Sequence, residues 1–350
     1  MWTDTTLGQL CKMYQPKTIS KKEMVAGGDY VVFGANGIIG TYDKYNHEEP
    51  QLLVTCRGAT CGAVNISEPF SWINGNAMVI QPDLGKVSLK YMEYLFRGGI
   101  NLSTAITGTA QPQITRKSLE PIKFSYPPLL EQERIVAKLD AAFAEVESLN
   151  KIVSIRKSEL AKLKKVLLLT TLSSEKSDLI NLGDVCELIY GKGLDKIDRL
   201  ENDGIPVYGA NGIKAYSTKF LSDEPSIIIG RKGSAGELNR VSSAFWALDV
   251  TYYTKINKKL IDLDFLYYTL SSMDLPSMAK GVKPGINRND VYKRFIYLPA
   301  LEEQKHIVSI LDAAYTEIEK VNDSVSKFKN NCDALKRAIL KQELQSSKAA

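Results

Sequence analysis

Histidine is nearly absent from this chain of 350 residues, with His47 and His306 as its only two. Serine and cysteine hydrolases place a histidine beside the nucleophile, and no convincing set of this kind includes either position. The five cysteines are scattered and odd in number, which is typical of reduced thiols rather than a disulfide framework. Cys56 and Cys61 are close in sequence, but no second pair or nearby histidine completes a zinc site. The sequence therefore predicts no metal site and argues against many hydrolases.

Long apolar runs and phosphate-binding glycine motifs are also missing. No stretch of about 18 apolar residues occurs, so we expect no membrane-spanning helix. The first residues lack the basic and then apolar layout of a signal peptide, and we expect a cytoplasmic protein. Neither GxGxxG nor GxxxxGK[ST] follows an expected strand, which argues against an enzyme that uses a nucleotide at its glycine turns.

The composition is that of a globular protein. The hydrophobic share is 44% and the net charge is +5, with an isoelectric point near 8.7. A chain of this length suits two or three domains. The mild basic surplus permits a nucleic-acid partner without requiring one.

The chain carries the same series of motifs twice, in the same order. Two early motifs recur after 175 residues: LGQLC at Leu7 with LGDVC at Leu182, and VFGANGI at Val32 with VYGANGI at Val207. Two later motifs recur after 172: QPQITRKSL at Gln111 with KPGINRNDV at Lys283, and LLEQERIVAKLDAAFAEVE at Leu129 with LEEQKHIVSILDAAYTEIE at Leu301. The collinear order indicates an internal duplication.

Each copy begins with a globular part of mixed pattern. Short apolar runs bounded by Gly, Asn and Pro predict strands at 31–33, 52–54, 77–80, 205–208, 227–229 and 250–253. One helix is expected in each copy, at 89–97 and 264–272, followed by closing strands at 122–126 and 295–298. We therefore predict an α+β fold with two small-sheet domains, at 1–128 and 175–299.

Each copy ends in a long helix, at 129–174 and 300–345. Proline and early glutamates, such as Pro128 with Glu131, favour a helix start. Apolar residues then recur at alternating steps of four and three, which predicts a coiled coil. The predicted seam comprises Ile135, Leu139, Val146, Leu149, Val153, Leu160, Ile307, Leu311, Ile318, Val321, Val325 and Phe328. Only Arg156 interrupts the stripe, where a polar residue could fix register. We expect the two helices to pair as an antiparallel hairpin with pseudo-two-fold symmetry.

The duplicated set resembles the specificity subunit of type I restriction–modification systems. The resemblance spans the chain from Leu7 to about Leu344. It is carried by the helix start Glu131-Gln132 and Glu303-Gln304, by the GANG turns at Gly34 and Gly209, and by RKGSAG at Arg231.

This resemblance implies two target-recognition domains, each reading one half of an asymmetric, bipartite double-stranded DNA site. The helices would set the spacing and dock two modification subunits, which would carry S-adenosylmethionine and methylate adenine. Restriction subunits would add translocation and cleavage driven by ATP with Mg. This chain itself would bind no cofactor and hold no catalytic group.

The residues expected at DNA lie in loops that occupy matched places in the two copies. They are Asn36, Arg57, Thr60, Gln111, Gln113, Arg116, Asn211, Arg231, Lys232, Ser234, Lys280, Lys283 and Arg288. Basic and amide side chains contact phosphates and base edges. Structural explanations stay open: a solvated turn at Arg57 and Arg231, a tight Asn-Gly turn at Asn36 and Asn211, and caps near Arg116 and Arg288. A coiled-coil scaffold whose globular ends bind protein is the alternative function.

Overall fold

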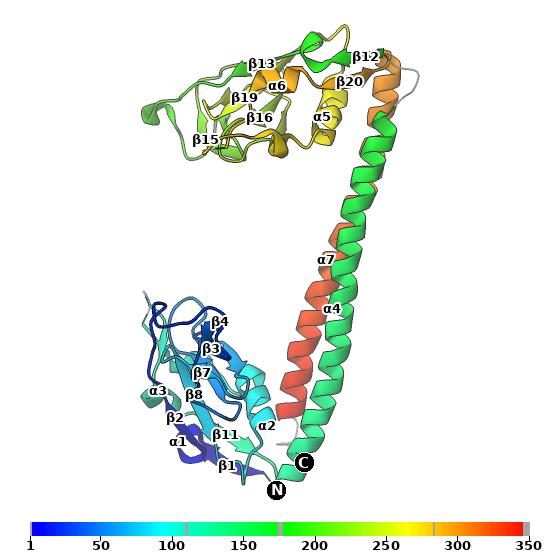
Figure 1. The fold of residues 1–350 in the computed structure, drawn as a ribbon. Helices are drawn as coiled ribbons and strands as arrows, with labels where there is room; N and C mark the ends of the chain where they lie inside the picture. The colour runs from blue at the N-terminus through cyan, green and yellow to red at the C-terminus, as the bar shows by residue number, and fades with distance from the viewer. Residues whose placement is uncertain (1, 109–110, 174–177, 283, 346–350) are drawn as a thin grey trace. The chain divides into compact units, whose positions relative to one another are not determined.

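The computed structural model describes residues 2–108, 111–173, 178–282 and 284–345 (Figure 1). The chain divides into two compact units, each with one globular part and pieces of both long helices. Unit 1 extends to Ser154 and resumes at Ser326, whereas unit 2 extends from Ile155 to Val325. Residues 2–127 are called the first globular part and residues 178–299 the second. The predicted boundary at 174/175 lies outside the described residues.

The first globular part is built on two small sheets. Its strands are β1 (Thr3–Thr6), β2 (Cys11–Tyr14), β3 (Tyr30–Gly34), β4 (Gly37–Tyr42), β5 (Leu52–Thr55), β6 (Val64–Ile66), β7 (Trp72–Ile73), β8 (Ala77–Pro82), β9 (Ile106–Thr107), β10 (Gln113–Ile114) and β11 (Lys123–Tyr126). Its helical elements are α1 (Leu7–Leu10), α2 (Leu89–Tyr94), η1 (Leu95–Gly99), η2 (Leu102–Ala105) and α3 (Arg116–Leu119). The sheet orders are β2-β8-β5-β6 and β4-β3-β7, while β1 pairs with β11 and β9 with β10.

The second globular part repeats this topology. Its strands are β12 (Asp178–Asn181), β13 (Cys186–Tyr190), β14 (Ile205–Gly209), β15 (Gly212–Ser217), β16 (Ser226–Gly230), β17 (Leu238–Val241), β18 (Trp246–Ala247), β19 (Thr251–Ile256) and β20 (Phe295–Leu298). Its helical elements are η3 (Leu182–Asp184), η4 (Lys196–Asp198), α5 (Leu263–Ser272), η5 (Leu275–Met278) and α6 (Arg288–Tyr292). The orders β13-β19-β16-β17 and β15-β14-β18 match those of the first part, and β12 pairs with β20. The predicted α+β class with two repeated small-sheet parts is confirmed.

The two long helices, α4 (Leu129–Leu172) and α7 (Leu301–Gln345), run antiparallel in each unit. In unit 1, Lys138 Nζ lies 2.7 Å from Glu343 Oε1. Farther along α4, Phe143 lies under the ammonium of Lys336, 4.5 Å from the ring centroid. The residue number thus rises along α4 as it falls along α7.

Unit 2 shows the same antiparallel direction. Lys164 of α4 is 3.2 Å from Glu319 Oε1 and lies 4.4 Å above the ring centroid of Tyr315. Leu168, nearer the end of α4, packs in one cluster with Ile307 and Leu311, nearer the start of α7. The predicted antiparallel coiled coil is confirmed.

The buried face of the long helices does not follow a strict heptad. Of the predicted seam residues, Ile135, Leu139, Val146, Val153, Ile307, Leu311 and Ile318 are buried, and Leu149, Leu160 and Val325 are half-buried. Val321 and Phe328 differ from the prediction because each is 46% exposed. Burial passes instead to Leu168 and Leu340, each one residue after the position where the alternating steps of four and three would continue, Leu167 and Ile339. A straight helix has 3.6 residues per turn, so its contact face drifts relative to a 3.5 repeat.

The end of α7 packs on the core of the first globular part. Leu340 and Leu344 are buried there together with Ile135 and Leu139 of α4. The helix predicted at 89–97 contributes to the same core. It is α-helical up to Tyr94 and continues as the π-helical turn η1. A Cβ added to Gly99 would lie 3.0 Å from Leu344, so glycine allows α7 to approach closely.

The repeated glutamine at each helix start ties the helix to its globular part. Gln132 is fully buried; its amide nitrogen donates to the carbonyl oxygens of Lys86 and Pro127, and its oxygen accepts from Ser88 N–H. Gln304 makes the same set of bonds, donating to Leu260 and Pro299 and accepting from Asp262. Buried amide groups must be satisfied in this way, and this need explains why the EQ phrase occurs twice.

The aspartate of the same phrase makes the next contact. Tyr94 of α2 donates its hydroxyl to Asp140, and Tyr268 of α5 donates to Asp312. Tyr94 also packs edge-to-face on Phe143, with ring centroids 5.4 Å apart. The repeated phrase therefore encodes a junction that fixes each globular part on its helices.

Within the described ranges, no helix combines the length and apolar character that crossing a membrane requires.

Candidate nucleic-acid interface

In the first globular part, the loop after β5 lies against the segment that leads into α3. Arg57 forms an antiparallel bridge with Gln113. The Ile114 N–H donates to the carbonyl oxygen of Cys56 over 2.9 Å. Two stretches that are far apart in sequence thereby meet at one edge. This brings together the predicted residues Arg57, Thr60, Gln111, Gln113 and Arg116, all of which are exposed.

The second globular part joins the corresponding segments in the same way. The Ile286 N–H donates to the carbonyl oxygen of Arg231 over 3.0 Å. Lys232 and Lys280 both bridge to Gly285. Two cationic residues from separate loops thus pair through their backbones with one glycine. Lys283 lies outside the described residues, and Ser234 is half-buried in the loop after β16.

The GANG turns lie beside these loops. In the first part, Gly34 pairs with Gly37 across the two turn residues, and the positive φ of 106° falls on Gly37 rather than on Asn36. Asn36 is exposed and accepts a 3.5 Å hydrogen bond from Asn65 Nδ2, while Thr55 at the end of β5 donates to the carbonyl oxygen of Ala35. The turn therefore lies at the edge that carries the Arg57 loop.

The matching turn of the second part has the same geometry. Gly212 has a φ of 105°, and Asn211 is exposed. A Cβ added to Gly230 would lie 3.0 Å from the carbonyl oxygen of Ala210, so the turn is packed directly against the residue before Arg231. Asn211 is thus close to the cationic loop. Its side-chain amide is exposed and can form hydrogen bonds with adenine.

Several predicted residues also have structural roles. Arg116 forms an exposed ion pair with Glu120, at 2.7 Å. Lys280 lies 3.5 Å from Asp290. Thr115, next to Arg116, caps α3, and Asn287, next to Arg288, caps α6. These are the helix caps that the sequence offered as a structural explanation of the two segments. Surface ion pairs of this type are weak, so both cations can exchange partners at low cost.

Arg231 and Arg288 converge on Tyr190, which the sequence analysis missed. The Arg231 carbon Cζ lies 5.4 Å from the Tyr190 ring centroid, and that of Arg288 lies 5.0 Å away. Burial raises the pKa of neighbouring Tyr252 to about 12, and its protonated hydroxyl donates to Ile286 over 3.0 Å. A comparison of the two copies could have singled out Tyr190, because the residue 175 positions earlier is Gln15.

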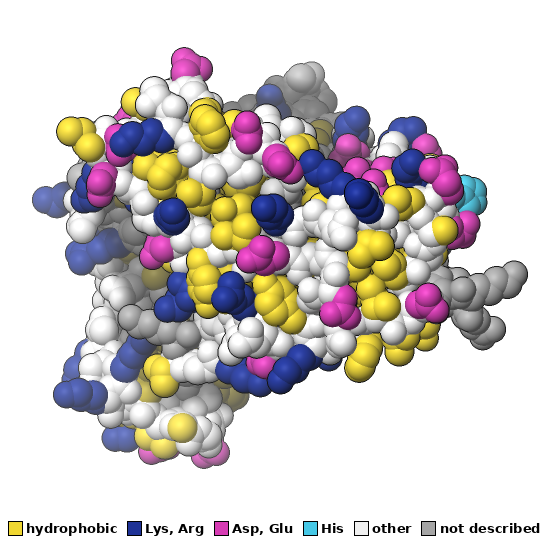
Figure 2. All heavy atoms as spheres, turned by 90° about the horizontal axis from the view of Figure 1, so that it is seen from above, with side chains coloured by type: hydrophobic (Ala, Val, Ile, Leu, Met, Phe, Trp, Pro, Cys, Tyr) yellow, Lys and Arg dark blue, Asp and Glu magenta, His cyan; other side chains and the backbone are white. Residues whose placement is uncertain are grey.

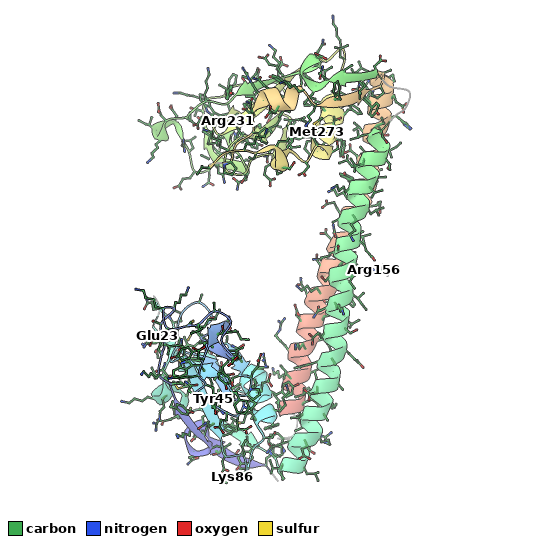
Figure 3. All side chains as sticks on the ribbon, viewed as in Figure 1. Glu23, Tyr45, Lys86, Arg156, Arg231 and Met273 are labelled. Atoms are coloured by element: carbon green, nitrogen blue, oxygen red, sulfur yellow. The ribbon has the colours of Figure 1, made fainter. Side chains whose placement is uncertain are left out.

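The face of the molecule drawn in Figure 2 carries charges of both signs. On the face drawn in Figure 2, Lys and Arg side chains alternate with acidic and apolar ones instead of forming one basic patch. Arg231 lies in the second globular part, whereas Arg156 lies on α4, paired with Glu159 at 2.8 Å (Figure 3). The candidate interface is assigned from the converging loops.

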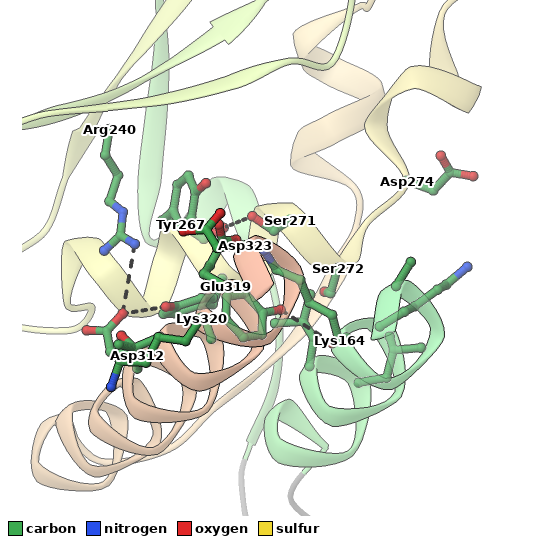
Figure 4. Close-up of a pocket in the computed structure, with 17 residues that line it drawn as sticks. Lys164, Arg240, Tyr267, Ser271, Ser272, Asp274, Asp312, Glu319, Lys320 and Asp323 are labelled. Carbon is green, nitrogen blue, oxygen red and sulfur yellow. Dashed lines mark hydrogen bonds and ion pairs between the residues drawn. The ribbon is translucent and has the colours of Figure 1, made fainter. Parts of the chain in front are cut away.

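A cavity of about 1000 Å³ lies between α5 and the paired helices of unit 2 (Figure 4). Arg240 lines it, pairs with Asp264 at 2.7 Å and lies 4.3 Å above the Tyr267 ring. Lys164 and Glu319 from α4 and α7 line it as well. Because its lining joins α5 to both long helices, and Arg240 also lies 3.9 Å from Asp312 of α7, the cavity belongs to the junction. Across residues 2–108, 111–173, 178–282 and 284–345, no cluster of His, Cys, Asp and Glu suits a metal ion.

Sequence comparison places both copies in one family. The model of the type I restriction modification DNA specificity domain matches residues 1–157 and again 174–324. The chain is 27% identical over 157 residues to the type I restriction enzyme EcoprrI specificity subunit of Escherichia coli, covering 43% of this chain but only 39% of that subunit. It is 25% identical to the putative type I restriction enzyme specificity subunit S.HindORF215P of Haemophilus influenzae, over 87% of this chain and 85% of the relative.

Solved structures share the fold. A chain from a structure of a type I R-M system, described with its complex assembly and conformational transition, superposes with a TM-score of 0.78 at 19% identity, covering 98% of this chain and 97% of that one. The HsdS subunit from Thermoanaerobacter tengcongensis gives 0.54 at 18% identity, covering 98% and 96%. Because the family model matches most of the chain in two successive copies, the protein belongs to the type I restriction modification DNA specificity domain family.

Proposed function

We propose that this chain is the DNA-reading subunit of a type I restriction–modification complex. Each globular part would read one half of an asymmetric, bipartite site in double-stranded DNA. The observation that carries the proposal is the convergence of exposed polar loops at the same edge of two parts with one topology. Their side chains differ, with Arg57 in one loop and Lys232 at its matched place, so the two half-sites would differ too.

The long helices would set the gap between the halves and dock two modification subunits. Apolar side chains on α4, such as Leu163 at 53% and Val166 at 56% exposure, offer a surface for a partner. The modification subunits would carry S-adenosylmethionine and methylate adenine, and restriction subunits would use ATP with Mg. This chain would act in the cytoplasm without a catalytic group of its own. A pure protein scaffold is disfavoured by the DNA specificity domain family.

Methylated adenines in the genome give the direct test. Cells with the modification subunits are mapped with and without this chain. We expect a bipartite motif with unlike halves that appears only when the chain is present. An adenine pattern that is unchanged by its removal would overturn the proposal.

The spacing role needs a separate variant. One heptad is removed from each helix in unit 1, residues 146–152 of α4 and the facing residues 329–335 of α7. Seven helical residues span about 10 Å, which corresponds to about three base pairs. We expect the gap to shorten by about that much while both halves stay the same. If the gap were unchanged in this shortened variant, the long helices would not set the spacing between the half-sites.

A further inference from the structure

One exposed tyrosine in the second globular part holds two arginines. Tyr190, at the end of β13, is 46% exposed and has both guanidinium groups within 5.4 Å of its ring centroid. Arg231 donates Nε and Nη2 to the carbonyl oxygen of Asp249, at 3.2 and 2.7 Å. Arg288 donates Nη1 to the carbonyl oxygen of Leu188 over 3.2 Å. Backbone carbonyls and one ring therefore fix two cationic groups, one from the loop after β16 and one from the first residue of α6.

Among the residues that the structure describes, no ion pair balances the charge of this cluster. In the described part of the chain, neither Arg231 nor Arg288 forms an ion pair with a carboxylate. A tyrosine ring attracts each cation only weakly at an exposed site, while the two like charges repel. Nη1 of Arg231 and both Nε and Nη2 of Arg288 keep N–H groups that none of these bonds uses. Arginine N–H groups match the oxygens of a phosphate, so an anion would relieve the repulsion.

We propose that Tyr190 is a positioning residue that holds Arg231 and Arg288 as a clamp for one backbone phosphate of the second half-site. The inference rests on the proposed DNA-reading function. A phosphate is favoured over a base because a negatively charged group stabilises two neighbouring positive charges. Phosphate contacts fix position and register without reading sequence. The clamp is confined to one half, because the first globular part has Gln15 and Cys56 at the matched places.

The test uses the complex with its modification subunits and two duplexes, one with the methylated site mapped in cells and one scrambled. Tyr190→Leu removes the ring, Tyr190→Phe keeps it, and Tyr297→Leu removes a tyrosine on β20 that is 41% exposed. We expect Tyr190→Leu to weaken binding to both duplexes about tenfold, from two weakened cation contacts. The slope of log affinity against log salt should fall by about one. Tyr190→Phe and Tyr297→Leu should bind as the unchanged protein does.

A second variant keeps the test decisive if Tyr190→Leu fails to fold. Arg231→Gln removes one clamp cation and should lower the salt slope by about one for both duplexes, with the melting temperature as a check of folding. Unchanged affinity and slope in Tyr190→Leu and Arg231→Gln would overturn the clamp alone. A loss confined to the mapped site, with altered base preference in its second half, would make the cluster a base reader and overturn the phosphate assignment. Equal binding of the unchanged complex to both duplexes would overturn the proposed function and the clamp with it.

Discussion

The two globular parts have one scaffold but different side chains at the edge where their loops meet. Position 56 is a cysteine that is 1% exposed, and burial raises its pKa to about 11, so it stays neutral. The matched position in the second part is Arg231, a permanent cation. Next to these, Arg57 matches Lys232 and keeps the charge. The difference shows that the fold preserves where side chains are displayed and leaves their chemistry free to change.

The junctions behave in the opposite way. Gln132 and Gln304 make the same three hydrogen bonds, and Tyr94 and Tyr268 both donate to an aspartate of the following helix. Buried polar groups tolerate little change, because each lost partner leaves an unsatisfied group. Identity at the junction and divergence at the loops are what a reader with two unlike halves requires.

The largest expected effect comes from breaking the shared junction. Gln132→Ala or Gln304→Ala leaves two carbonyls and one N–H without a partner, so each should lower the free energy of unfolding by about 3 kcal/mol. Denaturant unfolding measures this. Glu133→Ala and Glu303→Ala, at exposed residues next to these glutamines, are the controls and should change the free energy of unfolding little. A large loss in only one of the two glutamine variants would show that the junctions are not equivalent.

High pH should weaken both junctions. Burial, and then the hydrogen bond to the aspartate, raises the pKa of Tyr94 and of Tyr268 above the ordinary value of 10. Since the folded-state pKa is the higher one, this contribution is complete below pH 10 and is lost as pH rises beyond it. Thermal melting of the wild-type protein between pH 8 and 11 tests the direction.

Tyr94→Phe and Tyr268→Phe sharpen this test. Each should cost about 1–2 kcal/mol at pH 7, because a hydrogen bond to a charged group is lost. The double variant should also lose less stability than wild type between pH 10 and 11. An equal alkaline loss in wild type and double variant would assign the effect to other groups.

Removing the matched cation from one loop or the other should affect a different half of the DNA site. Arg57→Ala and Lys232→Ala should each weaken binding of the complex about tenfold, in line with about 1–3 kcal/mol for a lost arginine or lysine contact. Duplexes that carry only the first or only the second half of the mapped site show which half is affected. We expect each variant to act on a different half. If both variants acted on the same half, the two parts would not be independent readers.

The smallest effect is expected on α4. A register role was expected for Arg156, but its side chain is 68% exposed and, among the described residues, its ion pair is with nearby Glu159. Arg156→Ala should therefore change the free energy of unfolding by less than about 0.5 kcal/mol. Val146→Ala, at a buried position of the same helix, should cost about 2 kcal/mol. A larger loss from Arg156→Ala would restore the register role.

The repeat made the two-part α+β fold and the paired helices predictable from sequence, because motif order and apolar spacing are local properties. The drift of the buried face to Leu168 and Leu340 was not predictable in this way, since each of those helix ends packs on a globular core as well as on the start of the other long helix. Tyr190 was missed because its role depends on two arginines, 41 and 98 residues farther along the chain, meeting at one ring. The contact of every one of these loop residues with DNA stays a prediction.

An exchange of one globular part tests the central claim most directly. Residues 180–299 are replaced by the same region of a related chain that specifies a different methylated motif, and methylated adenines are mapped in cells that carry the modification subunits. The account predicts that one half of the motif changes to that of the donor, while the other half and the gap stay the same. A change in both halves would contradict it.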